Sequence, residues 1–161
     1  MSAFRRSAGG FTAKYDAEDA ALLANLARQV AALIAERGEP GEDPVLDRLL
    51  PDAYRDAPED AAEFRRFTES ELADDKIAGC LALAEAFDGE VVKKHITVRF
   101  EPPAAFAALR SLTDIRLALA TRIGVDDNGL PTATGDEVGL TFAIYNWLGG
   151  IQDSLVRAVD R

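Results

Sequence analysis

The residue types most often used in catalysis are scarce in this chain, which has one histidine and one cysteine. His95 lies in the stretch HITVRF beside Lys93 and Lys94, and no orienting partner for a general base is visible near it in the sequence. A metal site needs several ligands, whereas the carboxylates are scattered over predicted helix surfaces. No Walker, GxGxxG, HExxH or GxSxG motif occurs. The sequence therefore predicts no catalytic residue, metal site or cofactor, and we expect a protein that is not an enzyme.

Cys80 is the one thiol, so an internal disulfide is excluded. It lies on the apolar side of a predicted helix, near Ile77, Leu83 and Phe87. Buried free cysteine usually behaves as a small inert hydrophobic residue, whereas a redox role needs exposure and a lowered pKa. We expect Cys80 to be part of the core, and a redox role is the alternative.

Arg116 falls beside the apolar stripe of the helix that contains LTDIRLALATRIGV. At about 100° per residue it lies inside the arc of that stripe, whereas Arg110 and Asp114 lie on the far side and are four residues apart. A guanidinium in an apolar seam must find a carboxylate or carbonyl oxygens at helix ends. We expect such an internal bond. The alternative is a partly open seam in which Arg116 receives an acidic group from a partner or ligand.

The last predicted helix carries further candidates for structural or interaction roles. Its predicted core stripe consists of Leu140, Ile144, Trp147, Leu148, Ile151 and Leu155. Phe142 falls on the opposite, polar face, where it could anchor an interface or pack under the preceding loop. Asp153 and Arg157 on that face form an i,i+4 ion pair. Gly149-Gly150 predicts a close approach by another helix, a local bend or a contact with a second subunit.

Periodicity and turn signals predict a single domain over residues 1–161 that is mostly α (α+β). A β-hairpin over 3–15 and a strand near 95–100 are expected to form a small antiparallel sheet. The rest should be a helical bundle-like body. Its predicted helices cover residues 17–37, 44–50, 58–67, 69–87, 103–123 and 137–159.

Local signals set the expected helix ends. Asp16 is the expected N-cap of the first helix. Asp43, which precedes Pro44, is the expected N-cap of the second helix. Thr68 with Glu71 matches a capping box, which predicts that a new helix begins there. Gly124 is expected to end the helix that contains Arg116.

The net charge of −10 is concentrated in residues 36–90, which carry 17 acidic and 6 basic side chains, a balance of −11. A pI near 4.6 argues against broad contact with phosphates. The acidic region suits a protein partner with a basic surface, or a solvated surface that aids solubility. Direct DNA binding would need a local basic patch, for which the candidates are Arg5, Arg6, Lys93, Lys94 and Arg99.

The sequence shows no signal for a membrane. No stretch approaches the roughly 18 continuous apolar residues that a membrane span needs. The N-terminal MSAFRRSAGG has no apolar segment after its arginines, so a secretory signal is not expected. These features predict a cytoplasmic protein.

Three stretches carry a resemblance to a known family: residues 49–76 (LLPDAYRDAPEDAAEFRRFTESELADDK), 109–125 (LRSLTDIRLALATRIGV) and 145–159 (YNWLGGIQDSLVRAV). They resemble the DUF2017 family of actinobacteria, also labelled the AosR oxidative-stress regulator family. The resemblance implies a non-enzymatic protein in transcriptional control under oxidative stress, acting through contact with a partner such as an alternative sigma factor.

The chain departs from that family in one respect. The redox sensing attributed to the regulator uses a pair of cysteines near the N-terminus, and the first 16 residues here contain none. Sensing would then need an intermolecular Cys80 disulfide or another trigger. A small-molecule-binding or structural role without redox sensing is the alternative function, and a homo-oligomer is compatible with the sequence.

Overall fold

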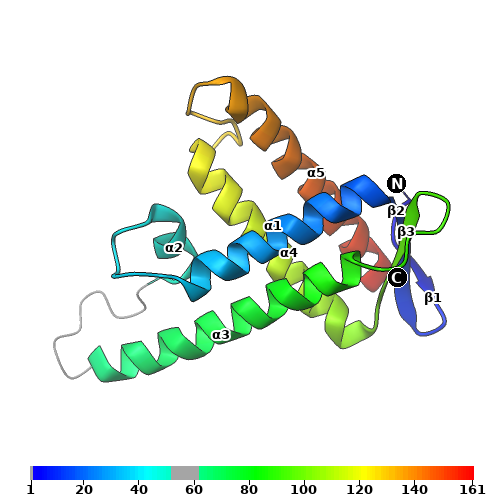
Figure 1. Ribbon diagram of the computed structural model, residues 1–161, viewed down its shortest axis with the longest axis horizontal. Coiled ribbons are helices and arrows are strands. Elements are labelled where there is room, and N and C mark those ends of the chain that lie inside the picture. Colours follow the sequence, from blue (N-terminus) through cyan, green and yellow to red (C-terminus); the bar gives the residue numbers. More distant parts are fainter. Residues whose placement is uncertain (1, 52–61) are drawn as a thin grey trace.

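The computed structural model describes residues 2–51 and 62–161 and contains helices and a small antiparallel sheet, as the sequence predicts. In chain order the elements are β1 (Arg5–Ser7), β2 (Gly10–Asp16), α1 (Ala17–Ala35), α2 (Pro44–Leu49), α3 (Ala62–Phe87), β3 (His95–Phe100), α4 (Pro102–Ile123) and α5 (Asp136–Val159). Helix α1 packs along α3, and α4 packs along α5, with α2 against α4. The sheet lies at one end of these helices, close to both chain termini (Figure 1).

The sheet has the order β1-β2-β3, and both pairs are antiparallel. Alternate side chains of β2 and β3 point into the core because successive side chains of a strand face opposite sides. These buried side chains are Phe11, Ala13, Tyr15, Ile96, Val98 and Phe100. The predicted hairpin and third strand are therefore confirmed, and their apolar face is closed by the helices.

One predicted helix boundary is wrong. We expected separate helices over 58–67 and 69–87, whereas α3 runs without a break from Ala62 to Phe87, and residues 58–61 lie outside the described part. A capping box requires a residue that leaves the helical conformation, and no proline or glycine lies near Thr68 to break the helix. Continuing an existing helix adds one hydrogen bond for each residue fixed, which is cheaper than starting a new one.

The other helix ends largely follow their predicted signals. The Asp43 side chain accepts a hydrogen bond from the Val45 amide, and Gly124 ends α4 in the left-handed conformation at φ 62°. Asp16 precedes α1 as expected, but its carboxylate makes no capping bond. It lies 3.1 Å from Nε2 of His95 instead, because the β2–β3 pairing places these two residues opposite each other.

The C-terminal part of α4, the N-terminal part of α5 and the loop between them project from the body of the molecule (top of Figure 1). We call residues 120–146 the arm. Leu140, predicted as a core residue, is 67% exposed here. It lies on the predicted stripe, but among the described helices α4 is the one with a substantial contact to α5, and no described element covers Leu140.

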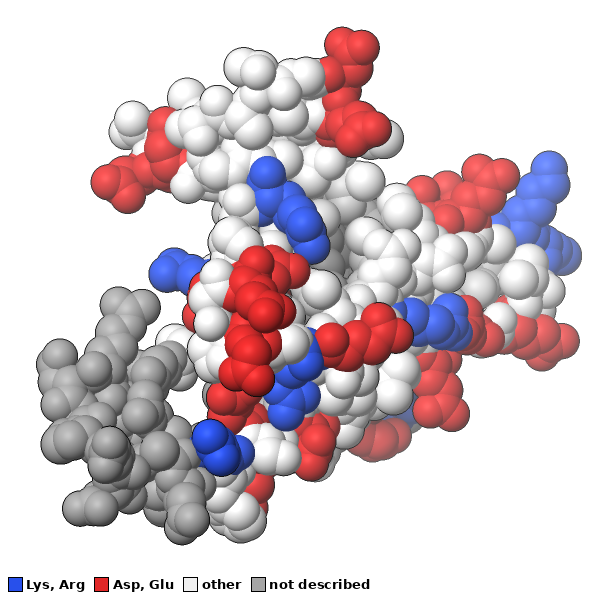
Figure 2. Space-filling view, turned by 60° about the vertical axis from the view of Figure 1, so that its left-hand side comes forward, with Lys and Arg blue, Asp and Glu red and all other residues white. Residues whose placement is uncertain are grey.

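Acidic side chains outnumber basic ones on the face of the molecule in Figure 2, as the composition predicts. The arm carries Asp126, Asp127, Asp136 and Glu137 but only one basic residue, Arg122 near its base. The upper lobe in Figure 2, which is the end of the arm, is mostly uncharged with acidic groups at its margins.

Candidate functional site

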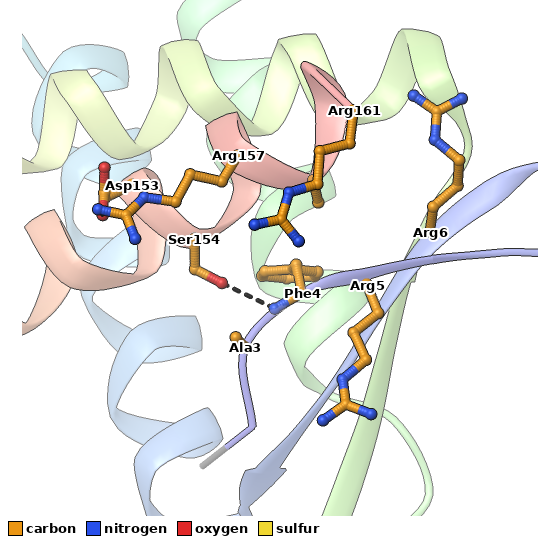
Figure 3. Close-up of a pocket in the computed structure, with 9 residues that line it drawn as sticks. Ala3, Phe4, Arg5, Arg6, Asp153, Ser154, Arg157 and Arg161 are labelled. Atoms are coloured by element: carbon orange, nitrogen blue, oxygen red, sulfur yellow. Dashed lines mark hydrogen bonds and ion pairs between the residues drawn. The ribbon is translucent and has the colours of Figure 1, made fainter.

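A pocket lies between the N-terminal segment and the C-terminal end of α5, with a volume of about 510 Å³ (Figure 3). It is lined by Ala3, Phe4, Arg5, Arg6, Asp153, Ser154, Arg157, Ala158 and Arg161. Four arginines and one aspartate thus share one concave surface in a protein whose net charge is −10.

The base of the pocket is held by Phe4 and Ser154. The Phe4 ring is buried against Tyr15 and Phe100, with ring centroids 6.0 and 5.8 Å away. The Phe4 amide donates a 2.7 Å hydrogen bond to Oγ of Ser154 on α5. These contacts fix the N-terminal segment to the last helix, so that the arginines of both segments border the same space.

The four arginines differ in how they are held. Arg6 donates to the carbonyl oxygen of Val159 at 3.1 Å, and its guanidinium lies 5.4 Å from the Phe11 ring centroid. Arg157 pairs with Asp153 at 3.0 Å, which confirms the i,i+4 pair expected from the sequence. Figure 3 shows the Arg157 and Arg161 side chains extending over the region of Ser154 and Phe4, on the opposite side of the chain from Arg5.

The sequence by itself predicts some of the residues of this pocket but does not show that they come together. Asp153 and Arg157 were expected as an ion pair, and two N-terminal arginines as part of a basic patch. Arg161 and Ser154 were missed. The spacing of Asp153, Arg157 and Arg161, each four residues apart, was a usable signal for one helix face. No local pattern could show that Phe4 meets Ser154.

The basic patch considered for DNA binding is divided between two ends of the sheet. Lys93 and Lys94 precede β3 at the end where His95 pairs with Asp16, whereas Arg99 lies near the other end of the strand. Arg99 donates to the carbonyl oxygens of Ser7 and Ala8 at 2.8 and 2.9 Å and lies 3.3 Å from a carboxylate oxygen of Glu101. Its guanidinium therefore serves mainly to hold the β1–β2 turn.

Arg116 lies between α4 and α5 and is partly buried. Its Nε donates to the carbonyl oxygen of Tyr145 at 3.3 Å, and Nη1 donates to Oε1 of Gln152 at 3.1 Å. Its Cζ is 4.4 Å from the centroid of the Tyr145 ring. We expected a carboxylate or the carbonyls of a helix end. The partners are instead the Gln152 side-chain amide, the Tyr145 ring and the Tyr145 carbonyl oxygen, which lies inside α5 and not at its end. All three are on the face of α5 against which the guanidinium packs.

Gly149 allows this approach. A Cβ atom at position 149 would lie 3.0 Å from Nη2 of Arg116, whereas a Cβ at Gly150 would meet nothing within 4 Å. For Gly149, the structure therefore shows the first of the three predicted roles, a close approach by a neighbouring helix. The group that approaches it is the Arg116 side chain of α4.

Cys80 belongs to a polar cluster buried between α3 and α4. Its side chain is 0% exposed, as expected, and burial together with the nearby Asp114 carboxylate raises the pKa of the thiol to about 11. The Ser111 hydroxyl and Lys76 act in the opposite direction. The helical spacing predicts Asp114 on the outer face of α4, the same face as Arg110, with which it would form an i,i+4 pair. It is instead buried and 2.7 Å from Nζ of Lys76, because α3 packs against that face of α4.

The aromatic candidates of α5 lie near the base of the arm. Phe142 is partly buried and stacks on Tyr145, with ring centroids 6.2 Å apart and planes at 13°. It is thus not fully exposed. Trp147 is partly buried and packs against the core, in agreement with its predicted place in the stripe.

His95 has the orienting partner that the sequence did not reveal. Nε2 lies 3.1 Å from an Asp16 carboxylate oxygen, and Nδ1 lies 2.8 Å from the Lys93 carbonyl oxygen. Both side chains of the ion pair are about half exposed on the edge of the sheet.

Among the described residues, no three His, Cys, Asp or Glu side chains are grouped as metal ligands. None of the helices described is long and apolar enough to span a membrane.

The fold and these sites define a mostly helical protein with a small antiparallel sheet, an arginine-lined pocket and a projecting helical arm. The model of the DUF2017 family, a domain of unknown function, matches residues 1–159, so the chain belongs to that family. No curated protein and no solved structure matches the sequence.

Proposed function

We propose that this chain is a non-enzymatic regulatory protein that acts by binding a protein partner, in transcriptional control under oxidative stress. The resemblance of residues 49–76, 109–125 and 145–159 to the AosR regulator family supports the cellular role. A sigma factor is the partner that this resemblance favours, and a cytoplasmic location follows from such a role.

The observation that carries the proposal is the apolar surface of the arm. Leu140 is 67% exposed at the start of α5, and Leu130 in the preceding loop is 55% exposed. The stacked rings of Phe142 and Tyr145 follow Leu140 by two and five residues, which is about half a turn and about one and a half turns of helix. Exposed apolar groups that project from a body are typical of a contact surface. The partly buried rings of Phe142 and Tyr145 lie on another face of the same helix and could add to it, because aromatic residues dominate binding energy at interfaces.

The charge around this surface restricts the partner. Residues 123–150 contain four carboxylates and no lysine or arginine. A partner that covers Leu130 and Leu140 would therefore present an apolar groove with basic side chains at its margins. The acidic region 36–90 would add to long-range attraction of the same partner.

Cys80 does not suit the role of the oxidant sensor in this proposal. Attack on peroxide requires an accessible thiolate, and this thiol is fully buried with a raised pKa. We place the oxidant-sensitive step in the partner or in the complex.

The proposal is tested by crosslinking pull-downs from lysate with and without peroxide, followed by binding assays with a purified sigma factor. The test variant is Leu140→Glu. The control is Leu81→Glu, which makes the same change at a 48% exposed position on α3, away from the arm. We expect the first to weaken binding about tenfold or more and the second to change it less than about threefold.

Two outcomes would contradict the proposal. One is that Leu140→Glu retains every partner that the unchanged protein captures. The other is that captured proteins have no connection with transcription in either condition. Charge-reversed variants of residues 36–90 test the electrostatic part separately, because they should make binding less sensitive to salt.

A further inference from the structure

The arginine-lined pocket is at the opposite end of α5 from the arm. Helix α5 has 24 residues and is therefore about 36 Å long at about 1.5 Å per residue. Leu140 lies near its first turn, and Arg157 near its last. A ligand in the pocket would consequently not compete with a partner on the arm.

The pocket has an excess of positive charge that the protein itself does not neutralise. Asp153 is the one acidic side chain among its lining residues, and it is paired with Arg157. Arg6 is held by the Val159 carbonyl oxygen and the Phe11 ring. For Arg5 and Arg161, the described residues provide no hydrogen-bond acceptor or carboxylate partner. Guanidinium groups are permanently charged and offer planar, paired N–H donors that match carboxylate and phosphate oxygens.

The base of the pocket is apolar rather than charged. Phe4 and Ala158 are buried there, and Ala3 lies beside them. A volume of about 510 Å³ falls within the roughly 300–1,000 Å³ of small-molecule sites, which combine a mainly apolar lining with a few polar groups that fix the ligand. The chain carries a net charge of −10, which disfavours the binding of an extended polyanion such as DNA.

We propose that this pocket binds a small organic anion, whose phosphate or carboxylate group is held by Arg157 and Arg161 and whose apolar part lies on Phe4 and Ala158. The bound anion would join the N-terminal segment to the end of α5, in addition to the hydrogen bond from Phe4 to Ser154. Binding would therefore stabilise the folded chain against heat.

The test is a calorimetric titration of the full chain at physiological ionic strength with four probes: phenyl phosphate, inorganic phosphate, glutarate and benzyl alcohol. We expect saturable binding of phenyl phosphate that is at least about threefold tighter than that of inorganic phosphate, because the apolar base contributes to binding. Benzyl alcohol, which lacks the charge, should not bind. Comparison of glutarate with phenyl phosphate distinguishes a carboxylate ligand from a phosphate ligand.

The pocket variant is Arg157→Ala with Arg161→Ala, and its matched control is Arg66→Ala with Arg110→Ala, which removes two exposed arginines outside the pocket. We expect the pocket variant to lose about tenfold or more in affinity and the control to stay within about twofold. Backbone amide resonances of Phe4 and Ser154 should shift on binding in the unchanged protein. Circular dichroism of both variants verifies that they are folded.

The proposal would be overturned by the absence of saturable binding for every anion. It would also be overturned by equal loss of affinity in the two double variants, since that would show a general charge effect. Binding of an acidic peptide such as poly-glutamate without binding of any small anion would assign the pocket to a protein contact instead.

Discussion

The guanidinium of Arg116 lies against Gly149, so that a Cβ atom at position 149 would be only 3.0 Å from its Nη2. The same guanidinium covers the Tyr145 ring and hydrogen-bonds to Gln152. The contact between α4 and α5 therefore depends on the Arg116 side chain of α4, which packs flat against α5 at the position of Gly149. These contacts hold α5 against α4 just below the arm.

Alanine substitutions at the two adjacent glycines should have different effects. Gly150→Ala should stabilise the protein by about 0.5–1 kcal/mol, because alanine favours a helix and nothing lies near the new Cβ atom. Gly149→Ala should be less stable than Gly150→Ala by about 1 kcal/mol or more, since Arg116 must move. Urea unfolding followed by the fluorescence of Trp147, the only tryptophan, measures both. If Arg116→Ala is introduced first, Gly149→Ala should become as favourable as Gly150→Ala. An unchanged difference between the two would contradict the account.

Arg116 and Gln152 should be energetically coupled. Gln152 accepts from Arg116 through Oε1 and donates through Nε2 to the Leu109 carbonyl oxygen and the Thr113 hydroxyl, at 3.2 and 2.6 Å. A double-mutant cycle of Arg116→Met and Gln152→Ala should give a coupling free energy of about 0.5–1.5 kcal/mol. Arg110→Ala, an exposed change on the same helix, is the control and should show additivity with Gln152→Ala. Strict additivity of Arg116→Met and Gln152→Ala would mean that their hydrogen bond contributes nothing.

The Lys76–Asp114 ion pair should behave as a buried pair, since its side chains are 20% and 8% exposed. Asp114→Ala leaves the ammonium of Lys76 without its partner and should lower the free energy of unfolding by about 2–4 kcal/mol. Lys76→Met combined with Asp114→Leu should recover part of that loss. Asp153→Ala breaks the exposed pair with Arg157 and should cost less than about 1 kcal/mol. Equal losses from the two aspartate substitutions would show that burial does not distinguish the pairs.

Cys80 should make the protein less stable at alkaline pH. The unfolded thiol loses its proton near its ordinary pKa of 9.0, whereas the folded thiol keeps it to about 11. The unfolded state therefore binds fewer protons in this range, and the free energy of unfolding falls as pH rises from about 9 to about 11. Relative to Cys80→Ala, the unchanged protein should lose on the order of 2–3 kcal/mol across this range. A constant difference between the two proteins across the same pH range would refute the assignment.

The same burial predicts slow thiol chemistry. At neutral pH the native thiol should react with an aromatic disulfide reagent far more slowly than the thiol of urea-unfolded protein, because both access and thiolate are lacking. Rapid modification of the folded protein, at a rate close to that of the unfolded chain, would reopen a sensing role for Cys80.

Much of the fold could be predicted from local patterns. The alternation in β2 and β3, the glycine that ends α4 and the apolar stripe of α1 each report a local property, namely which side of an element is apolar or where the backbone must turn. The burial of Cys80 and the pairing of Asp153 with Arg157 follow from helical spacing alone.

The tertiary structure decided the features that depend on which face a neighbour covers. A helical stripe shows where apolar groups lie, but it does not show how far along the helix another element extends, so Leu140 is exposed although it continues the stripe. Asp114 is buried for the converse reason, because α3 covers a face that its own helix marks as polar. The arginine pocket needs Phe4 to meet Ser154, 150 residues away. Such a contact arises from packing of the whole chain, and no spacing within either segment specifies it.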